Sequence, residues 1–140
     1  VAQEDAEAVR WFKKAAGQGN AEGQFELGFM YAHGRGVDQN DAEAVRWYRK
    51  SAEQGNIRGQ CNLGFMYREG RGIKQNYTEA VKWYKKAAQQ GDDVAQNNLG
   101  VMYHNGTGIY KDLRQAKYWY QKSAAQGNDQ AKENLNKLNQ

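Results

Sequence analysis

The sequence contains no proline, a single cysteine and only two histidines among its 140 residues. One cysteine excludes an internal disulfide and a multi-cysteine metal cluster, and two histidines leave little material for catalysis. No apolar run approaches the roughly 20 residues that a membrane-spanning helix needs. Because the net charge is only +4 and the chain carries 9 Tyr, 4 Trp and 4 Phe, we do not expect disorder, since disordered chains are poor in aromatics. The length suits one domain.

Glycine is abundant, with 16 residues, and it recurs at a fixed interval together with other residue types. Trp11, Trp47, Trp83 and Trp119 are each 36 residues apart. The same spacing holds for Ala8, Ala44, Ala80 and Ala116, for Gly19, Gly55, Gly91 and Gly127, and for Tyr31, Tyr67 and Tyr103. No insertion breaks the register, so one supersecondary unit is predicted to stack on copies of itself.

Each repeat is predicted to form two helices and no strand, because every long segment has helical spacing. First helices are expected at about 21–33, 57–69 and 93–105, and second helices at about 41–54, 77–90 and 113–126. Asn20, Asn56 and Asp92 are suitable N-caps for the first helices. Gly34, Gly70 and Gly106 stand where a left-handed residue would end them.

The two ends of the chain carry half repeats. We expect one domain over 1–140, in which 1–20 is the second helix of an incomplete repeat and 21–56, 57–92 and 93–128 are three full repeats. Residues 129–140 would form a C-terminal capping helix, since Asn136 and Lys137 replace apolar or small residues of the earlier copies. The first segment keeps the interior pattern with no cap before it, so earlier repeats or another chain would cover that end.

The marks of one repeat are Leu27-Gly28-x-x-Tyr31, Gly34-Arg35-Gly36-Val37, Ala44-x-x-Trp47-Tyr48 and Ala52-x-x-Gly55-Asn56. With these marks the chain resembles the Sel1-like repeat family, a relative of the tetratricopeptide repeats. The resemblance implies an all-α fold, a right-handed α-α superhelix of 36-residue helix–turn–helix repeats, with a concave face lined by the helices that carry Leu-Gly. It also implies a scaffold role. A cysteine-rich bacterial branch with links to penicillin binding is a poor match, because this chain has only Cys61.

The motif residues are expected to form the core. Gly28 allows a neighbouring helix to approach closely, and Trp47 is our candidate for the bulky side chain that fills the junction. The tryptophans and the motif tyrosines, leucines and methionines are expected to be buried, as large aromatics usually dominate such cores.

One face of the first helices differs between copies while the motif face stays constant. Positions 22, 25, 29 and 32 fall together on a helix, and in the implied superhelix they would line the concave groove. The mixture of aromatic and charged residues suits a peptide or protein partner, whereas neutral drift on a solvated surface would give the same variation. The candidate contact residues are Glu22, Phe25, Phe29, Arg58, Cys61, Phe65, Arg68, Glu69, Asn97, Val101 and His104.

The second helices carry 12 basic residues at recurring positions, which would form a basic stripe. Ordinary pairing within each helix, such as Glu43 with Arg46, and favourable interaction with the helix dipole explain most of them. Nucleic acid is therefore not the expected partner.

No motif for a metal, cofactor or catalytic site is present: His33 and His104 are isolated, and Ser51 and Ser123 lack the Ser-x-x-Lys arrangement. We expect a non-enzymatic scaffold without a cofactor that binds a protein or peptide. The alternatives are a structural spacer or self-associating segment, with end-to-end contact through the N-terminal helix, and a penicillin-interacting hydrolase. The sequence assigns no compartment, and bacterial cytoplasm, periplasm and secretion stay open.

Overall fold

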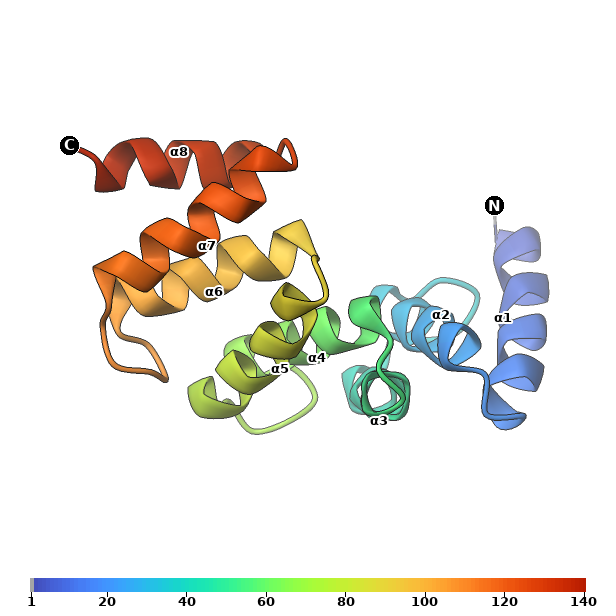
Figure 1. The fold of residues 1–140 in the computed structure, drawn as a ribbon. Coiled ribbons are helices and arrows are strands. Elements are labelled where there is room, and N and C mark those ends of the chain that lie inside the picture. Colours follow the sequence, from blue (N-terminus) through green and yellow to red (C-terminus); the bar gives the residue numbers. More distant parts are fainter. Residues whose placement is uncertain (1) are drawn as a thin grey trace. The chain divides into compact units, whose positions relative to one another are not determined.

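The computed structural model describes residues 2–140, so Val1, the first residue of the predicted 1–20 segment, lies outside the described residues. Every regular element of residues 2–140 is an α-helix (Figure 1). The chain forms two compact units, residues 1–75 and 76–140. Unit 1 contains α1 (Ala2–Gly17), α2 (Ala21–His33), α3 (Asp41–Glu53) and α4 (Ile57–Glu69). Unit 2 contains α5 (Tyr77–Gln89), α6 (Asp93–Asn105), α7 (Leu113–Ala125) and α8 (Asp129–Leu138).

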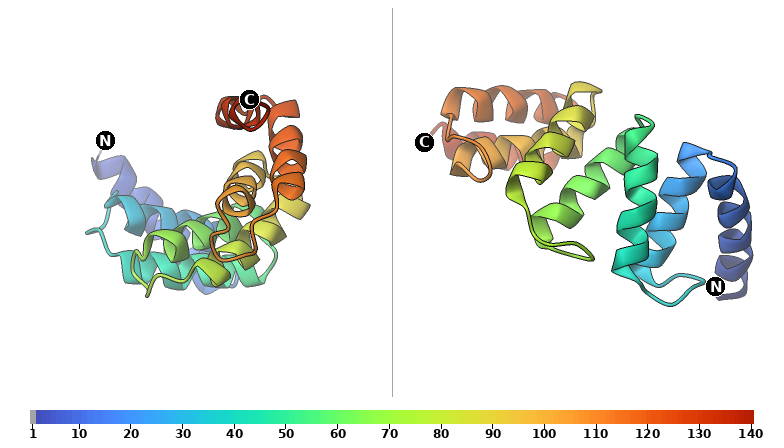
Figure 2. Two further views of the ribbon diagram at one scale, coloured as in Figure 1. Left: turned by 90° about the vertical axis from the view of Figure 1, so that its left-hand side faces the viewer. Right: turned by 90° about the horizontal axis from the view of Figure 1, so that it is seen from below.

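Within each unit, every helix packs against the next one along the chain. In the right-hand view of Figure 2, α1, α2 and α3 stand side by side as a row. The helix bounds predicted for the three full repeats agree with the structure to within one residue, because the capping residues fix them, whereas α1 ends three residues before the predicted end of the 1–20 segment. Asn20 Oδ1 accepts from the backbone N–H of Gly23 at 2.7 Å, and Gly34 ends α2 in the left-handed conformation at φ 63°.

Polar side chains, including those of the buried residues Ser51 and Ser123, join neighbouring helices in the same way in both units. Ser51 Oγ donates to the carbonyl oxygen of Ala21 at 2.8 Å, and Ser123 Oγ donates to that of Asp93 at 2.7 Å. Gln54 Nε2 donates to Gln24 Oε1 at 2.8 Å. These bonds satisfy groups that would be costly to bury alone, and they give both serines a structural role.

Two packing expectations were wrong. The ring that fills the junction at Gly28 belongs to Tyr48 and not to Trp47, since a β-carbon on Gly28 would lie 2.8 Å from Tyr48 Cδ1. Adjacent helical residues point about 100° apart, so only one of the two aromatics can face α2. Trp11 is 66% exposed although Trp83 and Trp119 are buried. Trp47 packs beside Val9, Leu27 and Met30 of the preceding helices, whereas no described helix precedes α1.

Candidate functional site

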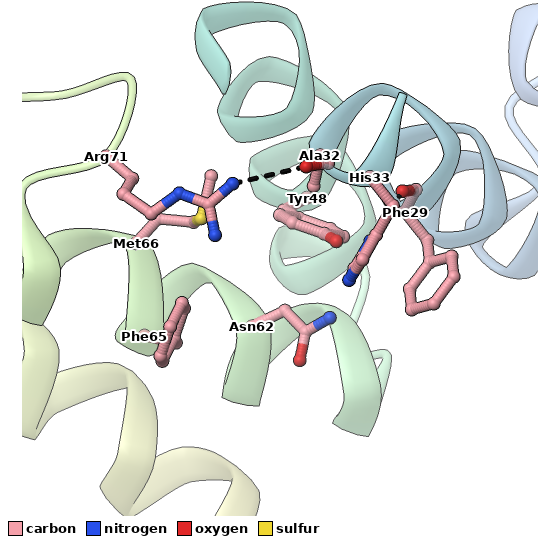
Figure 3. Close-up of a pocket in the computed structure, with 8 residues that line it drawn as sticks. All are labelled: Phe29, Ala32, His33, Tyr48, Asn62, Phe65, Met66 and Arg71. Atoms are coloured by element: carbon pink, nitrogen blue, oxygen red, sulfur yellow. Dashed lines mark hydrogen bonds between the residues drawn. The ribbon is translucent and has the colours of Figure 1, made fainter. Parts of the chain in front are cut away.

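A pocket of about 300 Å³ opens in unit 1 between α2 and α4 (Figure 3). Its lining residues come from three helices and one loop: Phe29, Ala32, His33, Tyr48, Asn62, Phe65, Met66 and Arg71. The pocket lies on the helices for which the sequence predicted a groove, and it contains Phe29 and Phe65 from the candidate contact residues.

The α2 wall is aromatic. Phe29 and His33 are one helical turn apart, so their rings lie on the same side of α2. They stack with centroids 4.0 Å apart and an interplanar angle of 27°. His33 Nδ1 lies 3.0 Å from the carbonyl oxygen of Phe29. This contact holds the imidazole against the Phe29 ring, while the remainder of His33 stays exposed.

The α4 wall consists of Asn62 and, one helical turn later, Phe65 and Met66. Phe65 is half-buried, and the guanidinium of Arg68 lies 5.3 Å from the centre of its ring. Arg68 Nε also donates to Glu69 Oε2 at 2.9 Å. The cation is thus held near the Phe65 ring, where a cation–π contact stabilises it.

Tyr48 of α3 closes the pocket from beneath. Burial raises the pKa of Tyr48 to about 12, and a hydrogen bond with Asn62 opposes that shift. The phenol is therefore neutral at physiological pH, and the base of the pocket carries no charge of its own.

Arg71 lies above the pocket and is anchored on the neighbouring repeat. Its Nε and Nη2 donate to the two carboxylate oxygens of Asp41 at 3.2 and 2.8 Å. Nη2 also donates to the carbonyl oxygen of Ala32 at 3.2 Å (Figure 3). The bonds to Arg71 hold the pKa of Asp41 below its ordinary value. We call these three hydrogen bonds of Arg71 the clamp. They use Nε and Nη2, so Nη1 takes no part in the clamp.

The arginine–aspartate part of the clamp occurs once more, where Arg35 Nη2 donates to Asp5 at 3.0 Å. Arginine and aspartate are 30 residues apart in both copies, and the third copy has Tyr77 and Thr107 at these positions. Sequence reasoning missed Arg71, Asn62 and Tyr48 as lining residues. In the sequence, Arg and Asp occur together in two copies and are both replaced in the third. This paired change could have indicated that the two side chains contact each other.

Three candidate contact residues are buried, namely Phe25, Cys61 and Asn97, which occupy equivalent positions in the three repeats. The Phe25 ring lies 6.2 Å from that of Phe29 and 5.8 Å from that of Tyr48. Asn97 Oδ1 accepts from Asn134 Nδ2 at 3.0 Å. These side chains support their neighbours and present little surface of their own.

Other candidates lie outside the pocket. Exposed Arg58 bridges α4 to α2 through ion pairs with Glu22 and Glu26, the latter at 3.1 Å. In unit 2, Val101 and His104 of α6 are half-buried. His104 Nδ1 lies 3.1 Å from the hydroxyl of Tyr120, which ties His104 to α7.

Residues 2–140 contain no group of three or more His, Cys, Asp or Glu side chains that could hold a metal ion. Within the same range no helix has the length and apolar character needed to cross a membrane.

Comparison with known proteins places these features in context. A family model described as Sel1 repeat matches residues 1–20, 21–56, 57–92 and 93–128. No curated protein sequence matches the chain. Among solved structures, a protective antigen of uropathogenic Escherichia coli strains that displays an SLR fold is 43% identical, with a TM-score of 0.90. That match covers 93% of this chain and 28% of the antigen, so the chain spans little more than a quarter of its length.

A Sel1 repeat protein from Oxalobacter formigenes is 46% identical with a TM-score of 0.83, and the match covers 92% of this chain and 97% of that one. Cysteine-rich protein B of Helicobacter pylori is 24% identical with a TM-score of 0.75 over 96% and 97% of the two chains, which shows a shared fold. These matches confirm the predicted all-α solenoid of helical repeats.

Proposed function

Because the chain belongs to the Sel1 repeat family, whose members are commonly non-catalytic protein-interaction scaffolds, we propose that it binds a peptide segment of a partner protein. One apolar or aromatic side chain of that segment enters the pocket between α2 and α4. The observation that carries this proposal is the pair of half-buried rings, Phe29 and Phe65, that line a pocket of about 300 Å³.

The size and lining of the pocket favour a single side chain over a whole small molecule. Its volume lies at the lower limit of ordinary ligand pockets, which span about 300–1,000 Å³. Phe29, Phe65 and Met66 offer apolar surface, and burying an aromatic or aliphatic side chain there removes apolar area from water. Aromatic anchors of this kind usually dominate the binding energy of an interface.

The polar groups of the pocket suit the backbone of a bound peptide. The side-chain amide of Asn62 and the Nη1 of Arg71 can donate to a peptide carbonyl oxygen, as both groups have N–H donors. Arg71 is already fixed by Asp41 and by the carbonyl of Ala32. Little side-chain entropy is therefore lost when a partner binds to it.

A peptide-display selection against the whole chain, followed by fluorescence anisotropy with a selected peptide, tests this function. We expect the selected peptides to share one apolar or aromatic anchor. Phe65→Ala should weaken binding by about tenfold or more, equivalent to about 1.4 kcal/mol.

Val101→Ala is the matched control, because Val101 occupies the position of Phe65 in the third repeat and does not line the pocket. Its affinity should stay within about twofold of the wild type. Equal losses in both variants, or selected peptides without any apolar anchor, would refute a binding site in this pocket.

A second candidate function is self-association through α1. Trp11 is 66% exposed and lines a shallow hollow with Glu7, Arg10 and Lys14. Tryptophan and arginine are enriched among the residues that dominate protein interfaces. Sedimentation over a range of protein concentrations tests it: the wild type should associate and Trp11→Ser should stay monomeric. A wild type that stays monomeric at every concentration excludes this function.

A further inference from the structure

Among the exposed residues of α7 and the loop before it, which also include Asp112, Leu113, Gln115, Lys117 and Gln121, five aromatic or cationic side chains form a set. We call this set the α7 face, and its members are Tyr110, Lys111, Arg114, Tyr118 and Lys122. Tyr110 is 94% exposed and Tyr118 is 47% exposed. Arg114, Tyr118 and Lys122 follow one another at intervals of four residues, so they form one row along the helix.

The cations of the α7 face are not neutralised within the described part of the chain. Helix α7 contains no Asp or Glu, and none of its cations forms an ion pair within residues 2–140. The N-cap Asp112 is the adjacent acid, and its Oδ1 accepts from the backbone N–H groups of Arg114 and Gln115 at 3.0 and 3.2 Å. In contrast, Glu43 of α3 pairs with Arg46 at 3.4 Å.

The residues of the α7 face occupy positions that are exposed in every full repeat. The equivalent positions of the two preceding repeats are also exposed, but none of them is aromatic. Asp38 and Lys74 correspond to Tyr110, and Arg46 and Lys82 correspond to Tyr118. Among the three full repeats, only the third places tyrosines there, so this surface is specific to the third repeat.

Tyr118 is held in place before any partner binds. Lys122 Nζ donates to the Tyr118 hydroxyl at 3.2 Å and lies 5.2 Å from the centre of its ring. The Trp119 ring packs edge-on against Tyr118 at 5.0 Å and 80°. A fixed ring beside a cation costs little entropy on binding.

The Tyr110 end of the face offers an apolar hollow. Tyr110 lines it together with Gly106, Gly108 and Ile109, and its volume is about 390 Å³. An aliphatic or aromatic side chain can occupy this space, and a phosphate or a sugar would gain little from Ile109.

From these features we propose that the α7 face binds an acidic peptide segment in which Asp or Glu alternates with apolar side chains. The carboxylates pair with Lys111, Arg114 and Lys122, while the apolar side chains pack against Tyr118 and in the hollow beside Tyr110. This surface shares no residue with the pocket between α2 and α4. Nucleic acid and anionic membrane also supply negative charge, so the test below includes both as competing ligands.

The test uses fluorescence anisotropy with the whole chain and a short labelled peptide in which Glu or Asp alternates with Leu or Phe. We expect this peptide to bind at least about tenfold more tightly than an oligo-glutamate of equal charge. Binding should weaken as salt is added, since exposed charges are screened. The double variant Arg114→Glu, Lys122→Glu should lose about tenfold or more in affinity.

The matched control is Arg46→Glu, Lys50→Glu, which changes the net charge equally on the corresponding row of α3. Its affinity should stay within about twofold of the wild type, and circular dichroism should confirm that both variants fold. Absence of measurable peptide binding, or equal weakening by both double variants, would overturn the proposal. Tighter binding of single-stranded RNA or of phosphatidylserine vesicles than of the peptide would also overturn it.

Discussion

Replacement of Gly100 by alanine tests the close approach of α6 and α7. A β-carbon on Gly100 would lie 2.6 Å from both Cδ1 and Cε1 of Tyr120 and 3.3 Å from the carbonyl oxygen of Ala116. Because carbon atoms pack at about 3.5–4.0 Å, the ring must move by roughly an ångström. Tyr120 is only 1% exposed and its hydroxyl lies 3.1 Å from His104 Nδ1, so the ring has little room to move.

The expected cost follows from two opposing effects. Alanine favours a helix over glycine by about 1 kcal/mol, while overpacking a core costs about 1–3 kcal/mol. Displacing the ring also breaks the hydrogen bond to His104, which is worth about 0.5–1.5 kcal/mol. We expect Gly100→Ala to lower the free energy of unfolding by about 2 kcal/mol. At about 2–4 °C per kcal/mol for a chain of this size, the melting temperature should fall by several degrees.

Thermal and urea unfolding followed by circular dichroism measure this change. The control is Gly17→Ala in α1, where a β-carbon would meet nothing within 4 Å. That variant should be as stable as the wild type or slightly more stable. Tyr120→Leu should lower the free energy of unfolding less in the Gly100→Ala background than in the wild type. The reason is that the smaller leucine side chain removes the clash with the alanine β-carbon. A Gly100→Ala variant with wild-type stability would refute the reasoning.

Two further predictions concern the tryptophans and the loop clamp. Trp83→Ala should lower the free energy of unfolding by about 3–5 kcal/mol, whereas exposed Trp11→Ala should change it by less than about 0.5 kcal/mol; similar losses in urea unfolding would contradict the packing described. The Asp41 pKa is lowered in the folded state, so the stabilisation from its pair with Arg71 is present above the unfolded pKa of about 3.9 and is lost as pH falls through the folded value. Asp41→Asn should therefore be up to about 1 kcal/mol less stable than the wild type at pH 7, and the difference should vanish in acid. Urea unfolding of both proteins at a series of pH values measures it, and a difference that stays constant as the pH falls would count against the pair.

The repeat register was predictable because its signals are local and recur at one interval. Asn20 and Gly34 act within a few residues of the helix ends that they fix. The amphipathic spacing of each helix likewise depends only on nearby residues. The helices of residues 2–140, and the bounds of those in the three full repeats, could therefore be predicted from the sequence.

The candidate site was predictable only in part. Phe29 and Phe65 were identified because they lie on the helix face that differs between copies, away from the constant motif face. Phe25 and Cys61 lie on the same side by sequence spacing, yet they are buried. A helical projection gives the direction of a side chain, but it does not say how closely the next helix approaches.

The amino-acid sequence by itself determined the helices and their caps, because hydrogen bonds within a few residues fix both. It also determined the 36-residue interval, which is read directly from the recurring residues. Only the tertiary structure decided which aromatic contacts Gly28, that Arg71 lies over the pocket between α2 and α4, and that Tyr118 stays exposed. These features depend on contacts between residues about 20 to 40 positions apart, or on whether such contacts cover a side chain. They are fixed when neighbouring helices pack.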